Sequence, residues 1–95
     1  MVEQRRAPRH QVQVTRTEVR TTDFAVQEAL LHDVSVYGCR FAGGAFGAGE
    51  RLWLSFPESS PVAATVVWSS NGQTGCRFEK PIERRLMRDL TLTIR

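Results

Sequence analysis

The chain has 95 residues, of which 41% are hydrophobic, 24% charged and 8% aromatic. This length fits one domain, and the hydrophobic fraction excludes a wholly disordered chain. No run of about 18 apolar residues is present, which excludes a membrane-spanning helix. The N-terminus lacks the apolar stretch of a secretory signal, and two cysteines are too few for a disulfide scaffold. We therefore expect a cytoplasmic protein.

Positive charge is concentrated near the N-terminus. The net charge is +3, and residues 1–20 contain five arginines and two glutamates, so residues 21–95 are neutral overall. A guanidinium offers several donors in a fixed plane, which favours arginine where phosphate or a guanine edge must be bound. The same arginines also suit a solvated basic tail, and composition alone slightly favours that second interpretation.

In chain order, the pattern predicts an arm, six strands and one helix. Pro8 excludes a helix at the start, so residues 1–10 are expected to form a flexible arm. Strand patterns occupy residues 11–20, 24–33, 38–42, 51–56, 62–68 and 75–80. The segment 24–33 also suits a helix, but its position between strand signals favours a hairpin. Residues 43–50 hold four of the seven glycines and are expected to form a loop.

Later elements carry clearer signals. Leu52, Leu54 and Phe56 lie on one face of a strand and residues 51, 53 and 55 on the other. The Asn71-Gly72 pair favours a hairpin turn. Pro81 suits the first turn of a helix at about 81–91, whose apolar stripe consists of Ile82, Leu86 and Leu90. Residues 11–95 therefore predict an all-β protein, a six-stranded antiparallel barrel with one C-terminal helix.

Side chains that could catalyse a reaction or bind a metal form no recognised pattern. His32, Asp33 and Ser35 are close in sequence, but strict alternation along a strand places His32 on the face opposite the other two. The two cysteines and two histidines lack the paired spacing of a zinc site. Cys39 and Cys76, both in GCRF tetrapeptides, are expected to face the core. We therefore expect no catalytic residue, no metal site and no enzyme activity.

Two groups of polar residues together suit a single ligand, and they are Arg5, Arg6, Arg9, Asp33, Ser35 and Gly38. The arginines can bind guanine O6 and N7, stack on the base or pair with phosphate. Asp33 can accept from guanine N1 and N2, and Ser35 can hydrogen-bond to a phosphate or base. Gly38 lets the backbone turn sharply and approach a ligand. A guanine nucleotide with several phosphates fits this combination.

These residues make the chain resemble the PilZ domain, the bacterial receptor module for cyclic di-GMP. Residues 5–9 match the family's Arg-x-x-x-Arg motif, and residues 33–38 match its Asp/Asn-x-Ser-x-x-Gly motif. The VVW sequence ending at Trp68 and the GCRF sequence at 75–78 look like the family's late strands. The resemblance covers essentially the whole chain after Arg5 and implies a six-stranded barrel whose arm folds over the ligand.

The resemblance also implies roles for the candidate residues. Arg5 and Arg9 would hold guanine edges and phosphates, while Asp33 and Ser35 would hold a guanine from the barrel side and Gly38 would keep that surface open. Residues with a weaker claim to the site are Arg6, Arg40 and Trp68. For Trp68, stacking on the ligand and packing on the barrel are equally good interpretations.

The function that the resemblance implies is that of a second-messenger sensor and adaptor. Cyclic di-GMP would be its ligand, no cofactor would be needed, and the rearranged arm would signal to a separate effector protein. Because Met1 lies four residues before the first motif, no upstream output domain is expected. An alternative is a PilZ-like adaptor that binds protein and no nucleotide. A third hypothesis, binding of a single-stranded nucleic acid polymer, is disfavoured by the neutral charge of residues 21–95. The number of bound ligands, one or an intercalated pair, stays open.

Overall fold

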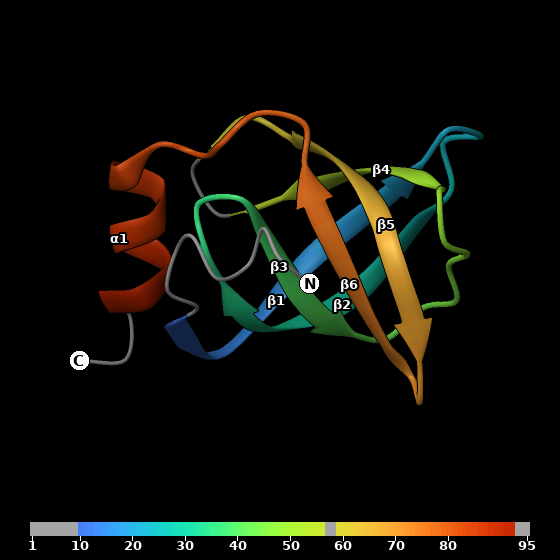
Figure 1. Cartoon of the computed structure of the whole chain (residues 1–95), viewed down its shortest axis with the longest axis horizontal. Coiled ribbons are helices and arrows are strands. Elements are labelled where there is room, and N and C mark those ends of the chain that lie inside the picture. Colours follow the sequence, from blue (N-terminus) through green and yellow to red (C-terminus); the bar gives the residue numbers. More distant parts are fainter. Residues whose placement is uncertain (1–9, 57–58, 93–95) are drawn as a thin grey trace.

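The computed structural model describes the backbone of residues 10–56 and 59–92, together with the side chains of residues 16–56 and 59–90. Within these ranges six strands form a closed antiparallel barrel, and one helix follows the last strand (Figure 1). The elements are β1 (His10–Thr21), β2 (Val26–Val34), β3 (Gly38–Ala42), β4 (Arg51–Ser55), β5 (Val62–Ser70), β6 (Gln73–Phe78) and α1 (Arg84–Leu92). The predicted fold class is confirmed, and residues 24–33 contribute a strand rather than a helix.

The strand order around the barrel is β1-β2-β3-β6-β5-β4, and β1 closes it by pairing with both β2 and β4. The hairpin between β5 and β6 turns at Asn71 and Gly72, whose φ angles are 54° and 75°. Positive φ at both central residues defines the hairpin turn that an Asn-Gly pair favours. This turn therefore follows directly from the local sequence.

The barrel interior is filled by the apolar side of each strand. Leu52, Leu54 and Phe56 are buried while Arg51 and Trp53 lie toward the outer face, as the alternating pattern predicts. Further buried side chains come from the other strands and include Val19, Leu31, Val34, Phe41, Ala64, Val66 and Phe78. The strands thus present their inner faces to one core and their outer faces to solvent.

The two GCRF tetrapeptides are paired with each other, one in β3 and one in β6. Cys39 stands opposite Cys76, and both are buried with no disulfide between them, which confirms the prediction that they face the core. In the same register, Gly38 lies opposite Arg77 and Arg40 lies opposite Gly75. On the outer face, each arginine therefore faces a glycine, which matters for the site below.

Ionisation of Cys76 is expected to make the fold less stable at high pH. Burial raises the pKa of this thiol from 9.0 to about 12, so the folded protein keeps a proton that the unfolded chain loses above about pH 9. Below about pH 9 the thiol is protonated in both states, so it does not change the free energy of unfolding. Between pH 9 and 12 the free energy of unfolding should fall by about 1.4 kcal/mol per pH unit.

Urea denaturation of the wild type and of Cys76→Ala between pH 8 and 11 measures this contribution. The variant lacks the titrating thiol, so its free energy of unfolding should fall less steeply above pH 9. Equal slopes for the two proteins would contradict the prediction.

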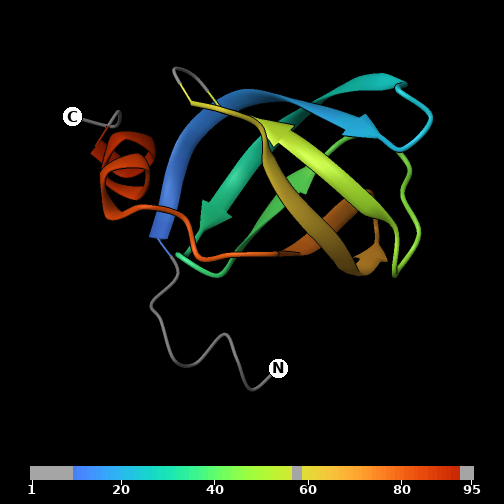
Figure 2. The same ribbon diagram turned by 90° about the horizontal axis from the view of Figure 1, so that it is seen from above.

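Helix α1 begins at Arg84, three residues after the predicted start at Pro81. The reason is that Ile82 already belongs to the hydrogen bonding of the barrel, since its N–H donates to the Val36 carbonyl at 2.9 Å. Of the predicted apolar stripe, Leu86 and Leu90 lie on the helix and pack against the core, whereas Ile82 is buried but precedes the helix. The helix lies at one end of the barrel, beside the start of β1 and opposite the β1–β2 hairpin (Figure 2).

Candidate functional site

The arginine motif lies just before the described part of the chain, because Arg5, Arg6 and Arg9 fall outside it. The first residues of β1 indicate where the chain enters the barrel. His10 pairs with Val34, and Gln11 pairs with Asp33, the first residue of the second motif. The chain therefore joins the barrel directly beside the end of β2.

Asp33 lies on the outer face of the barrel near the end of β2. Its Oδ2 accepts a hydrogen bond from Arg40 Nη2 at 2.8 Å, and its side chain is only 10% exposed. A register shift between Leu31 and Asp33 places Leu31 opposite the buried Phe41 and Asp33 opposite Arg40. This irregularity turns Asp33 outward, whereas strict alternation from Leu31 would point it into the core. The strict alternation assumed across this segment in the sequence analysis was therefore wrong.

Ser35 lies below the surface, where it shapes the turn between β2 and β3. The residue is 1% exposed, and its N–H donates to the Gly38 carbonyl at 2.8 Å. Its Oγ accepts from the Tyr37 N–H at 3.2 Å. The hydroxyl oxygen is thus engaged within the turn, and the described role of Ser35 is to hold the backbone between Asp33 and Gly38 in one conformation.

Gly38 is required by the pairing of β3 with β6. A Cβ atom at this position would lie 2.2 Å from the Cys76 carbonyl oxygen, closer than any real contact. Gly38 is not among the glycines with positive φ, so the expected sharp turn was the wrong reason for a glycine here. Close approach of the neighbouring backbone is the physical reason.

Asp33 belongs to a row of residues that crosses the outer face of four strands. It stands opposite Arg40 on β3, Arg40 stands opposite Gly75 on β6, and Gly75 stands opposite Trp68 on β5. The Trp68 indole covers Gly75, since a Cβ there would lie 2.2 Å from Nε1. The register therefore brings a carboxylate, a guanidinium and a half-buried indole onto one surface. Trp68 packs on the barrel and is still partly exposed beside the motif.

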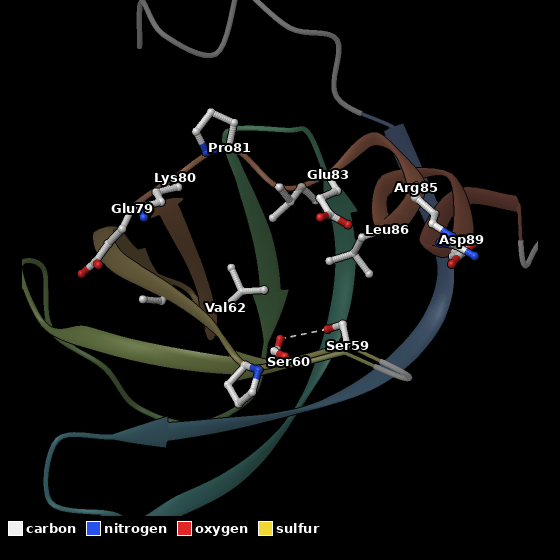
Figure 3. Close-up of a pocket in the computed structure, with 13 residues that line it drawn as sticks. Ser59, Ser60, Val62, Glu79, Lys80, Pro81, Glu83, Arg85, Leu86 and Asp89 are labelled. Carbon is white, nitrogen blue, oxygen red and sulfur yellow. Dashed lines mark hydrogen bonds between the residues drawn. The ribbon is translucent and has the colours of Figure 1, made fainter.

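A cavity of about 780 Å³ lies elsewhere, between α1 and the barrel (Figure 3). It is lined by residues 59–63, residues 79–83 and three residues of α1, and the described motif residues Asp33, Ser35 and Gly38 do not line it. One hydrogen bond connects the lining of the cavity to the second motif. The N–H of Ile82, in the lining segment 79–83, donates to the carbonyl of Val36 in the β2–β3 turn. The motif surface and the cavity are thus separate places joined by a backbone hydrogen bond.

The sequence was also compared with known protein families. The model of the PilZ domain family matches residues 3–94, nearly the whole chain. The chain belongs to the PilZ domain family. PilZ domains are receptor modules for cyclic di-GMP, binding and regulatory units rather than enzymes. A search of curated proteins gave no match.

Two further observations concern the described part of this PilZ domain. None of its helices is long and apolar enough to cross a membrane. The described residues also contain no group of three or more side chains suited to hold a metal ion.

Proposed function

We propose that this PilZ domain is a cyclic di-GMP sensor that acts in the bacterial cytoplasm as an adaptor for a separate effector protein. The observation that carries the proposal is the pairing of Gln11 with Asp33. It supports the proposal because the chain that follows Arg9 joins the barrel beside the surface that carries Asp33. A clamp built from both sequence motifs needs this proximity.

In the proposed clamp, the arm supplies positive charge and the barrel supplies the acceptor for the base. Arg5 and Arg9 bind guanine edges and phosphates, with Arg6 as an additional phosphate ligand. Asp33 accepts from guanine N1 and N2. A carboxylate can accept from more than one donor, and Asp33 already accepts a bond from Arg40. Trp68 offers an aromatic surface for stacking at the other end of the row.

The proposed output runs through the β2–β3 turn. A ligand bound by Asp33 and by the arm would change the conformation of the β2–β3 turn, which contains Ser35 and Gly38. That turn is hydrogen-bonded to the segment leading into α1, through Phe78 N–H to Tyr37 O at 2.8 Å and Ile82 N–H to Val36 O at 2.9 Å. A rearranged arm and a shifted α1 would present a new surface to the effector.

Calorimetric titration with cyclic di-GMP tests the function directly, with GTP and cyclic GMP as controls. Four good contacts supply roughly 4–12 kcal/mol, and ordering the arm costs about 2–5 kcal/mol of it. With stacking added, we expect a dissociation constant of about 1 µM. The stoichiometry distinguishes one ligand from an intercalated pair.

The opposite result would be no saturable heat up to hundreds of micromolar and no shift in melting temperature. That result would overturn the nucleotide-sensor proposal. It would favour the alternative of a PilZ adaptor that binds protein alone, whose capture of an effector would be insensitive to added cyclic di-GMP.

A further inference from the structure

Arg40 is held in a fixed position beside the acceptor that the proposed site uses. Its neighbours Cys39 and Phe41 are buried, so Arg40 lies on the outer face of β3. Its Nη2 donates to Asp33 Oδ2 at 2.8 Å, and the side chains are 35% and 10% exposed, respectively. A charge-assisted bond in a largely buried setting fixes the guanidinium and the carboxylate relative to each other.

One donor of Arg40 has no acceptor in the described part of the chain. Its Nε is buried and makes no hydrogen bond there. By contrast, Arg51 uses two donors on one carboxylate, with Nε 2.6 Å from Glu79 Oε2 and Nη2 2.9 Å from Glu79 Oε1. A buried donor without a partner is unfavourable, so Arg40 is less completely hydrogen-bonded than Arg51. A ligand can approach Arg40 through the part of its side chain that is exposed.

An aromatic side chain lies on the same surface as Arg40. The residue opposite it on β6 is Gly75, which contributes no side chain, and the next residue in the row is Trp68 with its indole over that glycine. An aromatic face, a guanidinium and a carboxylate therefore follow one another across the surface. A planar base is the kind of ligand that uses all three.

The Asp33–Arg40 pair presents acceptors and donors in the order that guanine requires. The Watson–Crick edge of guanine carries the O6 acceptor next to the N1 and N2 donors, so O6 can face the guanidinium while N1 and N2 face the carboxylate. Adenine carries a donor at N6 and an acceptor at N1. In the same position, adenine N1, an acceptor, would face the carboxylate, which is also an acceptor. The N6 amino group, a donor, would face the guanidinium, which is also a donor, so both contacts are unfavourable.

Building on the proposed function, we infer that Arg40 is a further ligand-binding residue that contacts guanine O6, and that the Asp33–Arg40 pair makes the site selective for guanine over adenine. Asp33 alone would accept the N1 and N2 protons of guanine. Arg40 adds the donor that contacts O6 and, through its bond to Asp33, holds the carboxylate in a fixed position.

The test compares the affinities of cyclic di-GMP and cyclic di-AMP in the wild type, Arg40→Leu, Arg40→Lys and Arg20→Leu. Arg20→Leu is the matched control, because Arg20 is an exposed arginine on the outer face of β1, opposite Val26 and Trp53. Arg40→Leu should weaken cyclic di-GMP binding about tenfold or more, which is the loss of one charge-assisted hydrogen bond. Binding of cyclic di-AMP should not weaken, so the ratio of the two affinities falls. Arg20→Leu should leave both affinities unchanged.

Arg40→Leu also leaves the Asp33 carboxylate without the bond from Arg40, which destabilises the fold. The ratio of two affinities measured on one preparation is independent of the fraction that is folded. Arg40→Lys keeps a cation beside Asp33 but loses the planar set of donors, so it should fold and lose selectivity severalfold. An unchanged affinity ratio in both Arg40 variants overturns the inference and leaves the proposed function intact. Failure of the wild type to bind cyclic di-GMP overturns the proposed function itself, and the inference with it.

Discussion

Replacing Gly38 with alanine is expected to destabilise the barrel by about 3 kcal/mol, the upper end of the range for overpacking a core. The added Cβ would lie 2.2 Å from the Cys76 carbonyl oxygen, 3.3 Å from the Cys76 carbonyl carbon and 3.4 Å from Arg77 Cα. All three are backbone atoms, so no side chain can rotate away, and β6 must move from β3. A loss of this size is a large part of the stability of a small domain.

Gly47→Ala is the matched control for Gly38→Ala. Nothing lies within 4 Å of a Cβ at Gly47, and its φ is not positive, so alanine should be tolerated there. Urea denaturation of both variants measures the difference. Equal stability of the two would contradict the steric role of Gly38. The expected instability also means that loss of ligand binding in Gly38→Ala reports on the fold, and it is no evidence for a ligand contact at this residue.

The strands and the β5–β6 turn were predictable because their signals are local. Alternation at Leu52, Leu54 and Phe56 requires only that one face of the strand is buried, and Asn71-Gly72 encodes its own turn. The start of α1 was predicted wrongly because Pro81 carries a local helix signal, whereas the bond from Ile82 to Val36 depends on a partner 46 positions away in the sequence. Tertiary hydrogen bonding overrode the local preference.

The residues of the candidate site stay a prediction from the sequence, and the geometry of those that the structure describes could not be predicted. The outward orientation of the Arg40 side chain follows from the apolar residues on either side of it in β3, which are buried. Its position beside Asp33 depends on a register shift that only the pairing of β2 with β3 defines. The same limit applies to Gly38, whose role is set by the backbone of β6 rather than by its own turn. Pairwise register is information that a single strand does not contain.

Reversing the charge of Arg9 is expected to remove measurable cyclic di-GMP binding, a loss of at least about 100-fold. Arg9→Glu would remove one charge-assisted contact, worth about 1.5–3 kcal/mol, and would also place a carboxylate where the proposed clamp binds phosphate. The fold should be retained, because the described barrel begins at His10. Calorimetric titration measures the affinity, and thermal unfolding verifies the fold.

Arg20→Glu is the control that separates a specific contact from general electrostatics. It changes the net charge by the same amount, at an exposed position on β1 that stands opposite Val26 and Trp53 rather than Asp33. A clamp formed by the arm predicts that Arg9→Glu abolishes binding while Arg20→Glu retains most of it. Equal losses would mean that overall charge attracts the ligand, and full binding by Arg9→Glu would remove the arm from the site. In that last case Asp33 and Arg40 would have to hold the nucleotide from the barrel alone.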